Sequence, residues 1–208
     1  AAQAANFSDD VVKWVSSTKG FSTISGTGVT QAIETGSTIA APAGASAATT
    51  INVGTKTAVT AVTGTSYIDT INFATTASAT VTPGAGADVI NLGNFANNAL
   101  TVNDSAGGVS ITGGTGVDNI TFLASTALGA TTTVDTGKGA DSITLPTGST
   151  TNAITITDVD GVTVTVGSTG VDTITLGAST TATINGFANT GVDVLVVPSS
   201  STATVTLD

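Results

Sequence analysis

Residues 113–121 read GGTGVDNIT, and a phrase of this kind, Gly-x-Gly-x-Asp-x-Ile, decides the fold because it recurs through most of the chain. The other copies, some of which match the phrase incompletely, are GTSYIDTINF (64–73), GAGADVINLG (84–93), GKGADSITLP (137–146), STGVDTITLG (168–177) and NTGVDVLVVP (189–198). Their central aspartates are Asp69, Asp88, Asp118, Asp141, Asp172 and Asp193. Self-similarity at such a period predicts a repeat architecture.

A second phrase, a short alternating strand such as VSIT (109–112) or TVTV (163–166), usually precedes the first. One coil therefore reads as strand, Asp turn, second strand and loop. Two nine-residue half-coils, LTVNDSAGG (100–108) and ITITDVDGV (154–162), explain the two long intervals between aspartates. Nine residues correspond to one strand plus one turn.

Within these strands Val, Ile and Leu fall on one face and Thr or Ser on the other, because successive side chains in a strand point to opposite sides. Coils stacked about 4.8 Å apart would join the apolar rows into a core. The prediction is an all-β protein, a parallel β-roll or β-helix-like solenoid with a short N-terminal cap segment. Two antiparallel sheets in a sandwich remain the alternative. Residues 1–57 are expected to form a capping and irregular region, and residues 58–208 the repeat solenoid.

Charged residues make up only 9% of the 208 residues, and the net charge is −10. With four Lys and no Arg, nucleic-acid binding is not expected. The chain has no His and no Cys, which excludes a Ser-His-Asp triad, a Cys nucleophile and a histidine zinc site. An aspartate pair for glycoside hydrolysis stays open, but aromatic residues are only 4% of the chain, so we expect no enzyme. The sequence has no run of about 18 apolar residues, so we expect no transmembrane segment.

The Asp phrase resembles the calcium-binding nonapeptide of the RTX family, Gly-Gly-x-Gly-x-Asp-x-(large apolar)-x. Residues 113–121 match every defined position, and residues 83–91 and 136–144 lack only the first Gly. The resemblance covers about residues 64–198. It implies a parallel β-roll in which Asp carboxylates and turn carbonyls hold Ca²⁺ between neighbouring coils. Family arrays place a binding turn on both edges, whereas here the phrase occurs about once per coil, so we expect the ions on one edge.

Electrostatics also favours a cation at the six motif aspartates. Stacked carboxylates some 5 Å apart would repel by about 3–4 kcal/mol per pair at an effective dielectric constant near 20. The candidate metal ligands are therefore Asp69, Asp88, Asp118, Asp141, Asp172 and Asp193, with Ca²⁺ as the ion. The alternative is that each Asp only accepts backbone hydrogen bonds within its turn.

In the N-terminal region, FSDDVVKWVSSTKG (7–20) has Ser8 as a candidate N-cap and Gly20 as a stop. A short capping helix is predicted there, with a strand over VVKWV (11–15) as the alternative. Trp14, the only Trp, is expected to cover an open end of the solenoid.

The composition, rich in Thr, Ala, Gly and Val, is similar to that of surface-layer proteins related to the RTX group. We therefore expect a self-assembling extracellular or cell-surface protein, a surface-layer or filament subunit secreted by the type I route. An adhesin or ice-binding module with a Thr-rich flat face is the alternative. Its candidates are Thr155/Thr157, Thr163/Thr165 and Thr204/Thr206, although such pairs do not fall at one fixed place in each coil of the sequence. A third hypothesis is an enzyme, or the secretion-signal tail of one, ending in STATVTLD (201–208).

Overall fold

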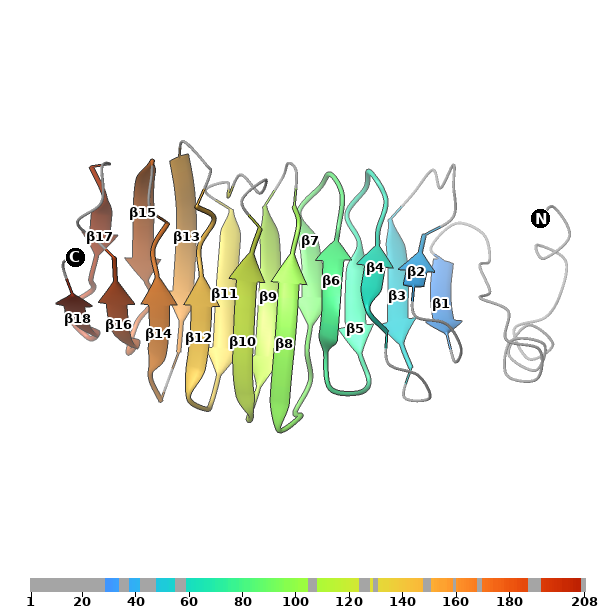
Figure 1. Ribbon diagram of the computed structural model, residues 1–208, viewed down its shortest axis with the longest axis horizontal. Helices are drawn as coiled ribbons and strands as arrows, with labels where there is room; N and C mark the ends of the chain where they lie inside the picture. Colours follow the sequence, from blue (N-terminus) through green and yellow to red (C-terminus); the bar gives the residue numbers. More distant parts are fainter. Residues whose placement is uncertain are drawn as a thin grey trace, which may run out of the picture.

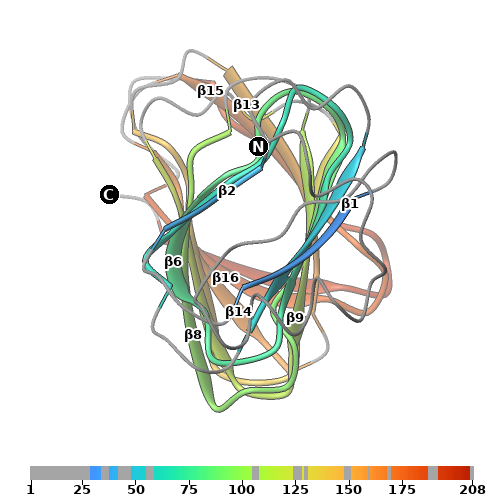
Figure 2. The same cartoon turned by 90° about the vertical axis from the view of Figure 1, so that its right-hand side faces the viewer.

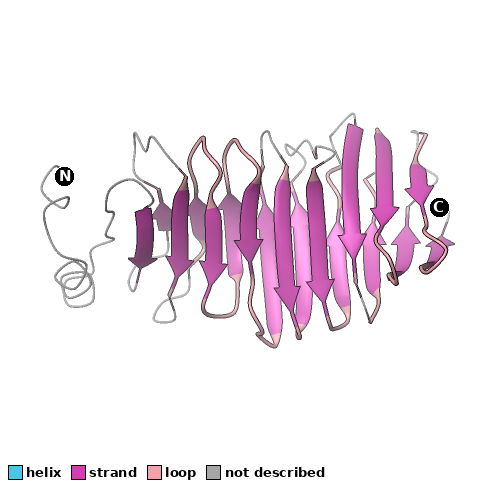
Figure 3. Cartoon of the chain, turned by 180° about the vertical axis from the view of Figure 1, so that it is seen from behind, coloured by secondary structure: helices cyan, strands magenta, loops and turns pink. Residues whose placement is uncertain are grey.

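The computed structural model describes residues 29–33, 38–41, 48–54, 59–104, 108–123, 128, 131–147, 151–158, 160–167, 170–186 and 192–206. All regular structure in these ranges is β-strand, and they contain no helix (Figure 3). The strands form two nine-stranded sheets that face each other along one axis (Figures 1 and 2). Sheet A contains β1 (Val29–Ile33), β3 (Thr49–Val53), β5 (Thr70–Phe73), β7 (Asp88–Asn91), β9 (Val109–Gly114), β11 (Thr132–Gly137), β13 (Thr151–Thr157), β15 (Val171–Leu176) and β17 (Val194–Val196).

Sheet B contains β2 (Thr38–Ala40), β4 (Ala61–Thr63), β6 (Ser78–Thr82), β8 (Asn97–Val102), β10 (Val117–Phe122), β12 (Asp141–Thr144), β14 (Val162–Thr165), β16 (Thr181–Asn185) and β18 (Thr202–Thr206). Every paired strand is parallel to its neighbour, and each strand pairs with the one two places along the chain. This connectivity confirms the predicted all-β parallel solenoid. An antiparallel sandwich is wrong, because its neighbouring strands would run in opposite directions.

The chain turns between the sheets at two edges. At the upper edge of Figure 1 the strands of sheet B end and those of sheet A begin, and at the lower edge the order is reversed. Paired residues in successive coils are 20 apart at Thr50 and Thr70, 19 at Thr70 and Val89, and 23 at Ser110 and Thr133. One half-coil therefore carries the chain from one edge to the other.

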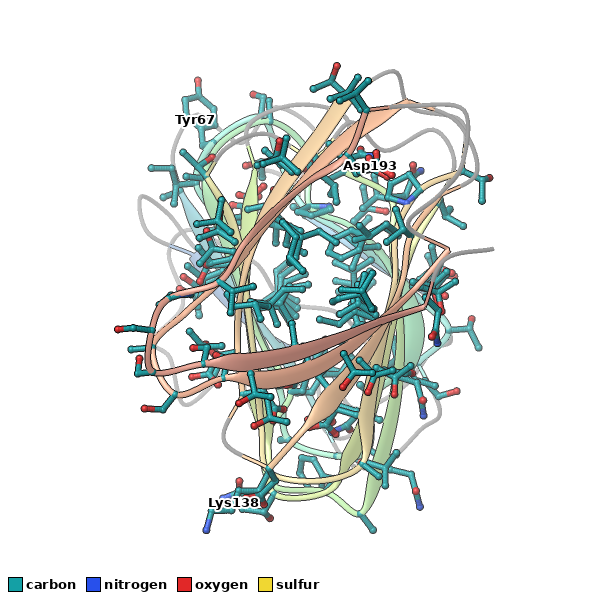
Figure 4. The ribbon with its side chains drawn as sticks, turned by 90° about the vertical axis from the view of Figure 1, so that its left-hand side faces the viewer. Tyr67, Lys138 and Asp193 are labelled. Carbon is teal, nitrogen blue, oxygen red and sulfur yellow. The ribbon has the colours of Figure 1, made fainter. Side chains whose placement is uncertain are left out.

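The core consists of columns of aliphatic side chains between the two sheets (Figure 4). The alternation of the sequence places one large apolar residue of each strand at the same height, so that each stacks on its counterpart in the next coil. Fully burying such a side chain stabilises the fold by about 1.5–3 kcal/mol. In sheet A the main column is Ile51, Ile71, Ile90, Ile111, Val134, Ile156 and Leu176. In sheet B it is Leu100, Ile120, Ile143, Val164, Ile184 and Val205.

The region expected to be an irregular cap, 1–57, contributes β1, β2 and β3 to the same two sheets. The regular coils therefore start earlier in the chain than the first Asp phrase. The predicted capping helix at 7–20 and Trp14 lie outside the described residues. Within the described ranges, no helix is long and apolar enough to cross a membrane.

Replacing a core side chain tests the stacking. Ile120 is 1% exposed in the middle of the sheet B column, so Ile120→Ala should lower the free energy of unfolding by about 2–5 kcal/mol through lost burial and a cavity. The neighbouring Thr121 points outward, and Thr121→Ala should cost about 1 kcal/mol or less. Urea unfolding followed by circular dichroism measures both. Equal costs would contradict the assigned faces of β10.

Candidate functional site: buried carboxylate columns

The six predicted aspartates lie at the starts of strands, but not in one column. Asp69 and Asp88 stack at the upper edge in sheet A, Asp118 and Asp141 at the lower edge in sheet B, and Asp172 and Asp193 again at the upper edge. Figure 4 shows Asp193 toward the edge that carries Tyr67, with Lys138 at the opposite one. The expectation of a single edge is wrong, because each inserted half-coil moves the next Asp turn across the solenoid.

In the first pair, each carboxylate accepts a backbone hydrogen bond from the preceding coil. Oδ1 of Asp69 accepts from the Thr49 N–H at 2.8 Å, and Oδ1 of Asp88 accepts from the Asp69 N–H at 2.7 Å. Oδ2 of Asp69 also accepts from the backbone N–H and the hydroxyl of Thr65. The Thr65 contacts lie within the turn, as the alternative of turn hydrogen bonding predicts. The bonds from the Thr49 and Asp69 N–H groups instead join neighbouring coils, which that alternative does not include.

The second pair begins with an asparagine that the sequence analysis missed. Asn98 Oδ1 accepts from the Ala77 N–H at 2.9 Å, and Asn98 Nδ2 donates to Asp118 Oδ1 at 2.6 Å. The Asp118 N–H then donates to Asp141 Oδ1 at 2.8 Å. The outcome is a continuous chain of hydrogen bonds across four coils.

The third pair repeats this arrangement. Asn152 Oδ1 accepts from the Leu128 N–H at 3.4 Å, Asn152 Nδ2 donates to Asp172 Oδ1 at 2.7 Å, and the Asp172 N–H donates to Asp193 Oδ1 at 2.9 Å. A sequence signal for both asparagines exists. NALTV (98–102) and NAITI (152–156) share the pattern Asn-Ala-aliphatic-Thr-aliphatic. Asn98 and Asn152 are 54 residues apart, which is also the separation of Asp118 and Asp172.

The glycines of the Asp phrase make room for this packing. A Cβ at Gly113 would lie 2.3 Å from Asp118 Oδ2 and 2.4 Å from the Thr136 carbonyl oxygen. Gly139 has φ +146°, and a Cβ there would lie 2.2 Å from the Gly116 carbonyl oxygen. Contacts this short exclude any side chain, so the phrase needs glycine because the coils and the carboxylate pack closely there.

Two further aspartates, one in each half-coil, lie at the ends of strands. Asp104 follows β8 at the upper edge, and Asp158 follows β13 at the lower edge; both are buried. Asp158 accepts hydrogen bonds from the Thr136 hydroxyl and from the backbone N–H groups of Asp160 and Gly161. These aspartates complete two acidic groups, Asp69/Asp88/Asp104 and Asp118/Asp141/Asp158, on opposite edges.

Burial is the main influence on the pKa of three of these carboxyl groups, Asp88, Asp141 and Asp172. It raises the pKa of Asp88 from 3.8 to about 6; the hydrogen bond from Asp69 opposes this rise, and the charges of Asp69 and Asp104 add to it. Burial likewise raises the pKa of Asp141 to about 6, with the charges of Asp118 and Asp158 adding to it. The pKa of Asp172 is also raised, first by burial. The ionised forms are therefore costly without a counter-charge.

The buried carboxylate oxygens meet some, but not all, of the requirements of a Ca²⁺ site. Oδ2 of Asp88, Asp141, Asp172 and Asp193 is buried with no hydrogen-bond partner in the described residues. Carboxylate oxygens of this kind are the ligands that Ca²⁺ prefers. However, the described residues contain no group of three or more acidic side chains arranged to hold a metal ion. A calcium ion at Asp88 or Asp141 would therefore need backbone carbonyl oxygens and water as additional ligands.

In metal-free buffer, the raised pKa values of Asp88 and Asp141 should make the protein less stable as pH rises. The folded state holds protons that the unfolded state releases at about pH 3.8, so this stability is complete below that pH and is lost as pH rises through about 6. The melting temperature in chelator should fall between pH 4 and pH 7. Asp88→Asn/Asp141→Asn should flatten the fall, and an unchanged slope would contradict the assignment.

Asp141→Asn alone gives a sharper test. The amide keeps an oxygen for the Asp118 N–H but removes the buried charge, so the variant should melt above the wild type at pH 8 in chelator and close to it at pH 4. Asp135→Asn is the matched control, because Asp135 is exposed on the outer face of β11. Destabilisation of Asp141→Asn at pH 8 would contradict a costly buried charge.

Comparisons with known proteins do not extend this description. No protein-family model, no curated protein and no solved structure matches the chain. What the chain does must therefore be argued from its own residues.

Proposed function

We propose that this chain is a structural, self-assembling protein of the extracellular space, a surface-layer or filament subunit of RTX-like type stabilised by calcium. The observation that carries the proposal is the outer side of β17 and β18, where no other described strand pairs with either sheet and the core column is partly exposed. The acidic columns support the calcium component independently.

The coil that contains β17 and β18 is unusually apolar on its surface. Five of the eight large hydrophobic residues that are exposed in the described part of the chain belong to it: Val192, Val194, Val196, Val197 and Val205. Val205 is 39% exposed, whereas Ile184, its neighbour in the core column, is 0% exposed. Leu195, which continues the column of Ile174, is only partly buried. An apolar surface of this kind marks an interaction site.

Backbone geometry indicates a second copy as the partner. Among the described strands, β17 pairs only with β15 and β18 only with β16, so both have a free side. At the other end of the described sheets, β1 and β2 likewise pair with a described strand on one side only, and they run in the same directions as β17 and β18. A copy translated along the axis could therefore continue both sheets in parallel. Head-to-tail contacts of this kind do not close, so they would yield filaments or lattices.

Charge supports calcium. Among the described residues Lys138 is the only basic side chain, and it lies at the lower edge (Figure 4). Within the described part of the chain, neutralisation of the buried carboxylates therefore depends on protons or on cations from solution. Sites of few acidic ligands in extracellular modules bind Ca²⁺ with Kd values of about 10⁻⁴–10⁻³ M. Such sites would be filled where calcium is millimolar, which fits an extracellular location.

Calcium removal tests this component. Chelation at pH 7.5 should lower the melting temperature, because millimolar calcium is about one to ten times such a Kd, and a cation that binds only the folded state then adds about 0.4–1.4 kcal/mol per site. The Asp141→Asn variant should lose part of this calcium-dependent gain, while Asp135→Asn should keep it all. Identical melting in calcium and in chelator would rule out calcium as the stabilising ion.

Assembly is tested at the free edge of β18. Electron microscopy and sedimentation should detect polymers of the wild type in calcium. Val205→Lys places a charge on the exposed end of the core column and should abolish them. Thr204→Lys is the matched control, since Thr204 is on the same strand but points outward, and it should still polymerise. A wild-type chain that stays monomeric at high concentration in millimolar calcium would refute self-assembly, whatever the outcome for calcium binding.

A further inference from the structure

Exposed valines collect on the outer face of sheet A at its last two strands. Val171 on β15 and Val194 and Val196 on β17 point away from the core and are exposed. Val192, which immediately precedes β17, is the most exposed of the large apolar residues described. We call these four residues the valine patch. Among the strand side chains that the structure describes in sheet A, no others are large, apolar and exposed.

The rest of this face is more polar. Outward asparagines on β3, β5 and β7 form a ladder, in which Asn72 Nδ2 donates to Asn52 Oδ1 at 2.9 Å and Asn91 Nδ2 donates to Asn72 Oδ1 at 2.7 Å. Asp135 lies on the outer face of β11. The valine patch is therefore confined to the end of the sheet, next to the free side of β17. An exposed apolar area that is bordered by polar surface marks an interaction site.

The head-to-tail contact proposed above does not cover the valine patch. A strand that pairs with β17 lies in the plane of sheet A and contacts only the edge of β17. Val194 and Val196 project from the outer face, roughly perpendicular to that plane, whereas Leu195 projects toward the core. Covering the patch therefore takes a further segment of chain that lies against this face.

Residues 1–28, which precede β1 and lie outside the described part of the chain, contain a segment with the required apolar side chains. VVKWV (11–15) has three valines and Trp14, the only Trp of the protein. Two of the six Phe, Phe7 and Phe21, flank it. Trp is among the residues that most often anchor protein interfaces, because one side chain buries a large apolar area.

Charge also favours this segment as the partner. Residues 11–28 carry two of the four lysines and no acidic residue. Of the fourteen acidic residues, all except Asp9 and Asp10 lie beyond residue 28, where only two lysines accompany them. Opposite charges therefore attract residues 11–28 to the acidic solenoid before the apolar contact forms.

The order of the strands indicates which copy supplies the segment. β1 and β17 belong to the same sheet, and both start at the upper edge (Figure 1). If β1 of the next copy pairs with β17, residue 28 of that copy enters beside Val192, about one strand spacing of 4.8 Å away. Within one chain, β1 and β17 are eight strand spacings apart, about 38 Å, and residues 15–29 span about 46–50 Å only when fully extended. The segment of the next copy is therefore the closer partner.

We propose that residues 11–15 of the next copy, with Trp14 as the anchor, bind the valine patch and so link successive subunits of the polymer. This inference rests on the self-assembly proposed above, and it adds a second contact that uses other residues than the pairing of strand edges. The other possible occupant is the valine patch of a neighbouring polymer, in a lateral contact between two solenoids.

Fluorescence of Trp14 tests the contact in the full chain, because no other Trp contributes to the emission. As the wild type polymerises in millimolar calcium, the emission should shift to shorter wavelength, since the indole leaves water. Val194→Thr/Val196→Thr replaces two apolar methyl groups by hydroxyls at nearly constant shape. It should raise the protein concentration needed for polymers by about tenfold. Val89→Thr is the matched control, an outward valine of β7 in the same sheet, and it should polymerise like the wild type.

Cross-linking identifies the copy that supplies the segment, because the chain has no Cys of its own. With a short bis-maleimide, polymers of Val15→Cys/Val194→Cys should yield a ladder of covalently linked chains on a denaturing gel. Val15→Cys/Val89→Cys is the control and should yield far less. A monomer linked only to itself would overturn the proposal, and so would efficient cross-linking of the single variant Val194→Cys, which would indicate the lateral contact.

The failure of this inference can be told apart from the failure of self-assembly. If polymers form without a change in Trp14 emission, and Val194→Thr/Val196→Thr polymerises like the wild type, the segment does not bind the valine patch, although self-assembly stands. A wild type that stays monomeric in millimolar calcium would refute both.

Discussion

The structure depends on the return of the chain to the same lateral position after each coil of 19 to 23 residues. Parallel pairing then places every inward side chain above its counterpart, so one apolar residue per strand is enough to build a continuous core. Extra residues are accommodated in the turns and not in the strands. A shift of one residue within a strand would exchange its inner and outer faces, which would bury Thr and expose Ile.

In the turns, polar side chains join successive coils by hydrogen bonds. Where a strand bends away, backbone N–H groups lose their partners in the ladder, and Asp69, Asp88, Asp141 and Asp193 supply a carboxylate oxygen in their place. Asn98 and Asn152 extend the same chains of hydrogen bonds through their amides. The cost is that the second carboxylate oxygen of Asp88, Asp141, Asp172 and Asp193 has no hydrogen-bond partner among the described residues. Structural and cation-binding roles of the same aspartate are therefore compatible, since they use different oxygens.

Much of this arrangement could be predicted from the sequence, because it is periodic. The alternation in VSIT and TITL indicates the faces, and the Gly-x-Gly-x-Asp phrase marks the turns. The distribution of the aspartates over two edges was missed although the two half-coils indicate it, because an insertion of half a coil moves the next Asp turn to the opposite edge. Asn98 and Asn152 were missed because asparagine at a strand start has no distinctive local pattern. Their 54-residue separation becomes informative only when it is compared with about two and a half coils.

The displacement of successive Asp turns by half a coil, to opposite edges, also affects the shape of the solenoid. If the acidic turns had all stacked on one edge, their mutual repulsion would have pushed the coils apart on that side alone. The solenoid would then have bent away from that edge. With Asp88 and Asp172 at one edge and Asp141 between them along the axis at the other, the repulsions oppose each other across the axis. Displacement of the motif by half a coil thus favours a straight solenoid, whether or not the carboxylates in its turns are ionised.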